Sequence, residues 1–152
     1  MKIQISKKEY LLLLDVFAIA EWVMNSHKVD SDPETEPYNK LEQKIMSYAD
    51  DAGCGHLVKY DKKQEEYFPT REYEEIGTYG RFIEQFEEDV FWEELGQRLA
   101  LRDLINDKGL EVVKEMDPVA RMTAEDAIAE TYQKEFYENG IEHLFLSEKI
   151  PN

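Results

Sequence analysis

The histidines of the chain are the first residues to consider for metal chemistry. Helical proteins hold a carboxylate-bridged pair of metal ions with glutamates and Glu-x-x-His motifs, because this spacing places both side chains on one helix face. The chain has three histidines, His27, His56 and His143. The residues three positions before them are Met24, Gly53 and Gly140. The sequence therefore lacks the motif, and we expect no metal site and no cofactor.

Cys54 is the single cysteine of the chain, and it lies two residues before His56. A zinc site would need two further ligands, and a nucleophilic thiol would need a third group to orient the histidine. Spacing identifies no such groups, so the pair is typical of a helix-end turn and no catalytic residue is predicted. A single cysteine also excludes an intramolecular disulfide and suits a reducing compartment.

Acidic residues alternate over residues 30–36, as they do at the start of a calcium-binding loop. Such a loop needs glycine at its sixth position and a glutamate at its twelfth. Thr35 and Leu41 occupy these positions here. We therefore expect no dedicated calcium site in this segment.

Four charged residues are flanked by large apolar ones: Asp15, Glu21, Arg98 and Arg102. If their helices are central, the carboxylates can pair with the arginines across the core, because the planar guanidinium binds a carboxylate through two donors. The same four groups could instead form a polar pocket for a small ligand. Both hypotheses stay open at the level of sequence.

The segment from residue 65 to residue 94 holds eleven acids and two bases, so its net charge is 2 − 11 = −9. Six of these acids are predicted to form an acidic helix face: Glu84, Glu87, Glu88, Asp89, Glu93 and Glu94. Charge runs of this kind usually form a solvated surface that keeps a protein soluble. The alternative is a docking face for a basic partner, including a mimic of nucleic-acid charge.

Helical periodicity predicts the elements that position these groups. The predicted helices run from Lys7 to His27 after a Ser6 cap, from Pro37 to a stop at Gly53, from Arg71 to Lys108 with a break near Gly77 and Gly80, and from a Thr123 cap to Gly140. Residues 56–70 read as a short hairpin or an irregular loop. We expect an all-α fold, a compact bundle of about five helices forming a single domain over residues 1–152.

The first of these helices is apolar on two sides. One broad face, expected to form the core, carries Leu12, Leu13, Val16, Phe17, Ile19, Ala20, Val23 and Met24. The second stripe carries Leu11, Leu14, Ala18 and Trp22. A helix of this kind is either central or shared with a partner. The second stripe is therefore predicted as an interface with another protein or a second copy.

The formal net charge of the 152-residue chain is 18 − 34 = −16. Anionic partners would repel it, so we expect no direct binding to nucleic acid and no binding to a membrane surface. Three lysines (Lys2, Lys7 and Lys8) precede an apolar run over residues 10–20 and imitate a secretory signal. Asp15 interrupts this run, however, and Ser6 and Glu9 have the spacing of a capping box. We expect a cytoplasmic protein.

Four stretches resemble a group of small, acidic bacterial proteins of unknown function: residues 5–24 (ISKKEYLLLLDVFAIAEWVM), 41–49 (LEQKIMSYA), 91–104 (FWEELGQRLALRDL) and 132–144 (YQKEFYENGIEHL). The resemblance implies a soluble helical domain from a bacterium, and it implies no activity, cofactor or catalytic residue. The leading hypothesis is a non-enzymatic protein that binds another protein or itself, as a homodimer. The alternatives are a helical-bundle enzyme or small-ligand carrier with a polar pocket, and the nucleic-acid mimic.

Overall fold

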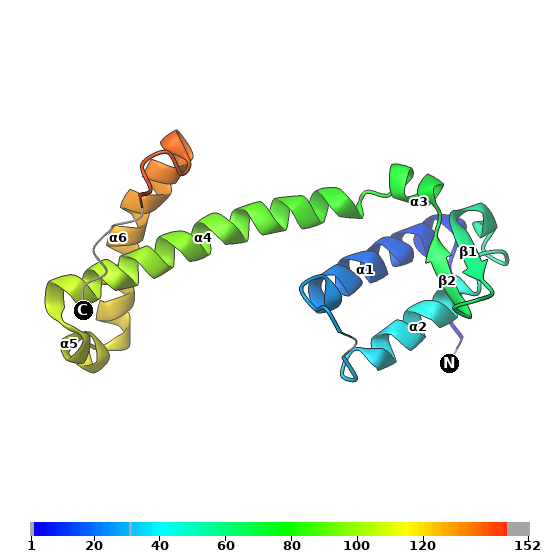
Figure 1. The fold of residues 1–152 in the computed structure, drawn as a ribbon, viewed down its shortest axis with the longest axis horizontal. Coiled ribbons are helices and arrows are strands. Elements are labelled where there is room, and N and C mark those ends of the chain that lie inside the picture. The colour runs from blue at the N-terminus through cyan, green and yellow to red at the C-terminus, as the bar shows by residue number, and fades with distance from the viewer. Residues whose placement is uncertain (1, 31, 146–152) are drawn as a thin grey trace. The chain divides into compact units, whose positions relative to one another are not determined.

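The computed structural model describes residues 2–30 and 32–145, and most of these residues are helical (Figure 1). The α-helices are α1 (Lys7–Asn25), α2 (Glu36–Met46), α3 (Arg71–Ile76), α4 (Tyr79–Lys108), α5 (Leu110–Glu115) and α6 (Pro118–Asn139). A 3₁₀ turn, η1 (Gly55–Leu57), leads into the strands β1 (Val58–Asp61) and β2 (Glu66–Pro69). The predicted all-α class is confirmed, and residues 56–70 take the hairpin alternative.

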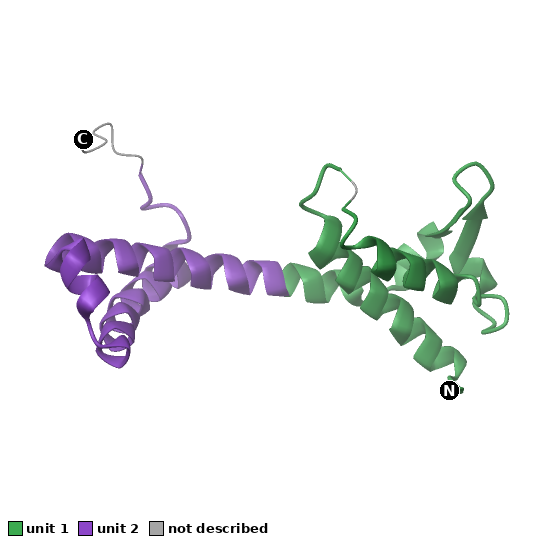
Figure 2. Ribbon diagram, turned by 90° about the horizontal axis from the view of Figure 1, so that it is seen from below, with its two compact units in different colours: residues 1–85 green, residues 86–152 purple. Residues whose placement is uncertain are grey.

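Contacts between residues divide the chain into two compact units, residues 1–85 and residues 86–152 (Figure 2). The boundary falls inside α4, so this one helix contributes residues to both units. The single domain expected over residues 1–152 stays a prediction. The two units are described one at a time.

The first unit is built on α1 and α2, which lie side by side (Figure 1). Ser6 and Glu9 form the predicted capping box, because the Ser6 hydroxyl accepts the Glu9 N–H while the Glu9 carboxylate accepts the Ser6 N–H. The Tyr10 hydroxyl donates to the Ile45 carbonyl at 2.9 Å and so ties α1 to the end of α2. The core cluster consists of Tyr10, Leu14, Met46, Ala49, Cys54, Leu57 and Tyr73.

The hairpin packs against α2 through one glutamine. Strands β1 and β2 are antiparallel, with Tyr60 opposite Tyr67. The Gln43 side chain donates to the Tyr67 carbonyl at 2.9 Å and accepts the Tyr67 N–H at 2.6 Å. It thereby satisfies both backbone groups of that residue, as a third strand would do. Gln43 therefore sets the position of β2 on the helix.

A short break separates α3 from α4, where the sequence predicts one. Thr70 caps α3 by accepting the Tyr73 N–H, and the helix ends at Gly77. A Cβ atom on Gly77 would lie 2.7 Å from a ring carbon of Tyr79. Glycine therefore allows Tyr79, the first residue of α4, to fold back and stack on Tyr73, with the ring centroids 5.5 Å apart.

The second unit packs α5 and α6 around the rest of α4, with Leu104, Val113 and Phe136 among its buried residues. Its last helix begins earlier than predicted. Asp117, not Thr123, is the N-cap: its carboxylate accepts the Val119 and Ala120 N–H groups, and Pro118 takes the first helical position. The predicted stop at Gly140 is confirmed by its left-handed φ of 57°.

The apolar character of α1 does not make it a bilayer-spanning segment. Within residues 2–30 and 32–145, every helix is either too short or too polar to cross a membrane.

Candidate functional site

Helix α1 presents different surfaces on its two sides, and the inner one is the stripe that the sequence predicts as an interface. Leu14 lies in the core with 3% of its surface exposed, and Leu11 packs against that core. Ala18 and Trp22 line a cavity of the same unit. Leu11 and Leu14 of the predicted interface stripe therefore face the core, whereas Trp22 lines the cavity with 42% of its surface exposed.

The outer side of α1 is the face that the sequence predicts as core. Leu12, Val16 and Val23 are 54%, 59% and 58% exposed, and Ile19 is half-buried. The assignment of this face to the core was wrong for the three exposed residues. Periodicity shows that a helix has two apolar sides, but it cannot say which side meets the neighbouring helix.

A cavity of about 430 Å³ lies in the first unit, between the inner side of α1, helix α2 and the hairpin. Its apolar wall is formed by Leu14, Met46, Leu57, Val58, Pro69 and Ile83. Aromatic rings come from α1, β2, α3 and α4: Trp22, Tyr67, Phe68, Tyr73 and Tyr79. Residues of α1, α2, η1, both strands, α3 and α4 therefore line one partly open space. Concave spaces of this kind are the usual small-molecule sites.

Three carboxylates line this cavity, namely Glu21, Glu42 and Glu66. Burial, reinforced by the nearby Glu21 carboxylate, raises the pKa of Glu42 to about 7. Glu42 therefore changes its charge near neutral pH. Of these three residues, sequence analysis had selected only Glu21.

Sequence analysis gave no indication of a role for Glu42, because helical spacing predicts a different core stripe for this segment, made of Tyr38, Leu41, Ile45, Tyr48 and Ala52. Ile45 and Ala52 of this stripe pack against the core, whereas Tyr38, Leu41 and Tyr48 are exposed. The side that faces the cavity carries Asn39, Glu42, Gln43 and Met46. Among these four residues only Met46 is apolar, so it alone could have indicated from the sequence that this side of α2 faces inward; the structure buries it.

Asp15 is held in the wall behind the cavity. Its carboxylate accepts hydrogen bonds from the Tyr73 hydroxyl at 2.8 Å and from the Thr78 hydroxyl at 3.1 Å. Burial, together with this bond to a carboxylate, raises the pKa of Tyr73 well above its usual range. The Tyr73 hydroxyl therefore stays protonated and fixes its ring in the wall of the cavity.

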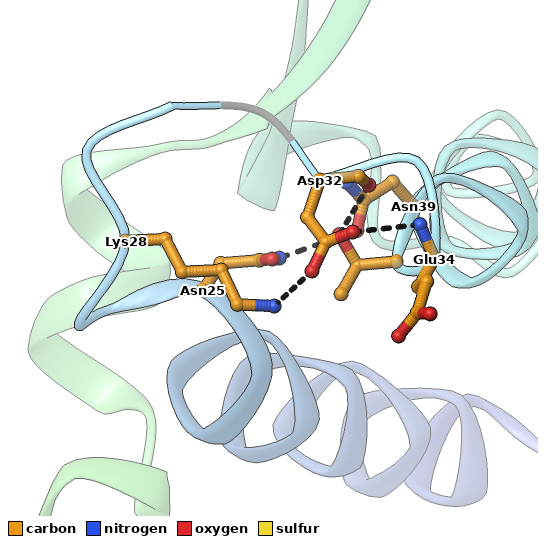
Figure 3. A network of polar contacts seen from close by, with 6 residues as sticks. Asn25, Lys28, Asp32, Glu34 and Asn39 are labelled. Atoms are coloured by element: carbon orange, nitrogen blue, oxygen red, sulfur yellow. Dashed lines mark hydrogen bonds and ion pairs between the residues drawn. The ribbon is translucent and has the colours of Figure 1, made fainter.

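The acidic loop before α2 forms a local polar network rather than a set of free ligands (Figure 3). The Asp32 carboxylate accepts hydrogen bonds from the Lys28 ammonium group at 2.7 Å and from the Glu34 N–H at 2.8 Å. These bonds lower the pKa of Asp32. Asn25 donates to Asn39 at 3.4 Å, which links the end of α1 to a residue of the cavity wall.

The four charges predicted to meet in one core belong to different units. Asp15 and Glu21 lie in the first unit, and Arg98 and Arg102 lie in the second. Arg98 is exposed and pairs with Glu94 one turn earlier, with 3.1 Å between Nη2 and the carboxylate. Local partners thus replace the predicted core pairing, and of the four charges only Glu21 lines the cavity.

Arg102, like Arg98, interacts with residues of its own unit. Its guanidinium contacts Asp103 at 2.8 Å and the Tyr132 hydroxyl at 3.0 Å, and the Tyr132 hydroxyl donates to Asp103. These contacts lower the pKa of Asp103, mainly because the guanidinium stabilises its charged form. The cluster joins α4 to α6 on the surface of the second unit.

All six residues of the predicted acidic face, Glu84, Glu87, Glu88, Asp89, Glu93 and Glu94, are exposed. Three of them, Glu88, Asp89 and Glu93, border a second hollow, together with Trp92 and Phe136, in the second unit. The described residues that line this hollow all belong to α4 and α6. It is therefore walled on fewer sides than the cavity of the first unit.

Cys54 is fully buried in the core of the first unit, whereas His56 is exposed and lies 3.8 Å from Glu72. Their side chains therefore occupy different environments. In the part of the chain that the structure describes, no three side chains of the His, Cys, Asp or Glu type are grouped so as to hold a metal ion.

Comparisons with known protein families, curated proteins and solved structures give no match to this chain. The resemblance to small acidic bacterial proteins stays a prediction.

Proposed function

We propose that the protein acts by binding a second copy of itself through the outer face of α1. This face consists of Leu12, Val16, Ile19 and Val23, and we call it the outer stripe. The observation that supports the proposal most directly is the exposure of three of these four side chains by more than half. Contiguous apolar surface of this kind marks interaction sites in water-soluble domains.

The spacing of the outer stripe favours another helix as its partner. The four residues follow one another at intervals of four, three and four, as the a and d positions of a heptad do. Valine occupies the a positions, while leucine and isoleucine occupy the d positions. β-Branched residues at a with leucine at d favour two-stranded pairing, so the same stripe on a second copy is a suitable partner.

Local charge does not oppose this pairing. The four residues of the outer stripe are uncharged; the acids of the same segment, Asp15 and Glu21, lie between them in sequence, and the whole chain has a net charge of −16. Two heptads form a small interface, and interfaces below about 1,200 Å² are typical of weak complexes. We therefore expect a dimer whose population depends on protein concentration.

The test is the molar mass in solution, measured by light scattering and sedimentation over a wide range of protein concentration. The Val16→Glu substitution places a charge in the centre of the outer stripe and should give a monomer. Val119→Glu is the matched control, because Val119 is also helical and exposed. The control should dimerise like the unchanged protein.

Two results would contradict the proposal. One is an unchanged protein that stays monomeric at the highest concentration reached. The other is a folded Val16→Glu variant with the same dimer population as the unchanged protein, because the contact would then lie on another surface.

A further inference from the structure

We propose that the cavity of the first unit binds a small organic cation, a protonated amine attached to an apolar body. The proposal concerns the inner side of α1 and does not depend on self-association through the outer stripe. It rests on the charge of the cavity, on the partial burial of Glu42, on the aromatic walls and on the volume of the cavity.

The charge of the lining selects a cation. Glu21, Glu42 and Glu66 supply three carboxylates from three different elements, α1, α2 and β2. Among the described residues that line the cavity, Lys, Arg and His do not occur. An anionic ligand would be repelled, whereas an ammonium group would be attracted at short range in a partly desolvated space.

Glu42 is the carboxylate best placed to receive the ammonium group. No described side chain or backbone group forms a hydrogen bond or ion pair with it, although it is half-buried. Partial burial makes the charged form of this carboxylate costly, and together with the nearby Glu21 carboxylate it raises the pKa of Glu42. An ammonium group beside Glu42 would supply the missing partner.

The walls fit the remainder of such a ligand. Trp22, Tyr67, Phe68 and Tyr79 offer aromatic surface, which attracts cations through the ring faces. Leu14, Met46, Val58 and Ile83 offer aliphatic surface for an apolar body. The Tyr73 hydroxyl is already bonded to Asp15, so the ring of Tyr73 contributes shape and not a hydrogen bond.

The size of the cavity favours a small molecule over a polypeptide. Its volume of about 430 Å³ lies within the range of small-ligand pockets, roughly 300–1,000 Å³. The space lies between α1, α2 and the hairpin and is partly open to solvent, so binding of a peptide is one of the outcomes that the test below distinguishes. We therefore commit to a small amine as the occupant.

Phenethylamine is the probe for the test, because it joins one ammonium group to one aromatic ring. Its neutral counterpart is 2-phenylethanol, and its anionic counterpart is 3-phenylpropanoate. In the Trp92→Phe variant Trp22 is the only tryptophan, so its fluorescence reports on the cavity. Titration calorimetry on the unchanged chain gives the dissociation constants.

We expect saturable binding of phenethylamine with a change in Trp22 fluorescence, at least tenfold weaker binding of 2-phenylethanol, and no binding of 3-phenylpropanoate. Glu42→Gln keeps the shape of the side chain and removes its charge, so it should weaken amine binding about tenfold or more. Glu93→Gln makes the same change in the second hollow and should leave the dissociation constant unchanged.

Three results would overturn the proposal. The first is equal affinity for phenethylamine and 2-phenylethanol, or no binding of either. The second is amine binding that Glu93→Gln weakens and Glu42→Gln does not. The third is binding of a short lysine-containing peptide without binding of phenethylamine. If circular dichroism shows that Glu42→Gln does not fold, Glu21→Gln takes its place, with the same tenfold expectation.

Discussion

Glu42 joins the chemistry of the cavity to the stability of the first unit. Burial and Glu21 raise the pKa of Glu42 from 4.5 to about 7, so the folded protein holds this proton more tightly than the unfolded chain does. The stability that the proton contributes is complete below about pH 4.5 and is lost as the pH rises through about 7. Glu42→Gln removes this dependence, because its amide is neutral at every pH.

The measurement is urea denaturation of both proteins at pH 4.5 and at pH 7. Relative to Glu42→Gln, the unchanged protein should lose about 1–2 kcal/mol of unfolding free energy between these values, less than the full shift implies because the group is partly solvated. The control for the loss of one negative charge is Glu93→Gln, because Glu93 is exposed and lies in the second unit. If the unfolding free energies of Glu42→Gln and the unchanged protein differ by the same amount at both pH values, the pKa assigned to Glu42 is wrong.

Single residues also mark the limit of what sequence could predict about the site. The capping box of Ser6 and Glu9 was predicted, because both partners lie within one turn. The bonds from Gln43 to Tyr67 and from Asp15 to Tyr73 join residues 24 and 58 positions apart. Such pairs depend on how elements pack, so periodicity and local spacing carry no signal for them.

At the scale of elements, the short link between α3 and α4 positions an aromatic wall of the cavity. Gly77→Ala would bring a Cβ atom within 2.7 Å of the Tyr79 ring and 3.0 Å of the Tyr73 carbonyl. Either the ring or the backbone must then move, and the Tyr73–Tyr79 stack would open. We expect a loss of about 1–3 kcal/mol in unfolding free energy, as for other overpacked sites.

Gly80→Ala is the matched control for this prediction. It lies three residues later, within α4, where an added Cβ meets nothing within 4 Å. Alanine is the better helix former, so this change should be neutral or stabilise by up to about 1 kcal/mol. Equal destabilisation by both substitutions, measured by urea denaturation, would show that contact with Tyr79 is not the cause.

Elements were predicted better than their faces. Helix α1, the break at Gly77 and the stop at Gly140 follow from caps, breakers and periodicity, which act locally. The inner and outer sides of α1 could not be distinguished, since both are apolar. The start of α6 was predicted too late. The pair Asp117–Pro118 is as typical of a turn as it is of an N-cap followed by the first residue of a helix, and sequence alone does not distinguish the two.

At the scale of the whole molecule, the net charge of −16 opposes every contact between two copies. The exposed acids of the predicted acidic face contribute to this repulsion. A neighbouring base neutralises some of them locally, as Arg98 does for Glu94. An apolar contact through the outer stripe must overcome repulsion between like charges. Binding of a basic partner to the acidic face would instead be strengthened by the same negative charge, because opposite charges attract.

The two modes of association therefore respond to salt in opposite directions. Added salt shortens the screening length from about 10 Å at 0.1 M to about 3 Å at 1 M. Self-association through the outer stripe should become several-fold tighter over this range, as repulsion is screened and apolar contact is retained. Sedimentation velocity at both salt concentrations measures this change, and Val16→Glu should stay monomeric throughout. A dimer that dissociates as salt rises would instead be held by ion pairs, and the uncharged stripe between Leu12 and Val23 could not then be its contact surface.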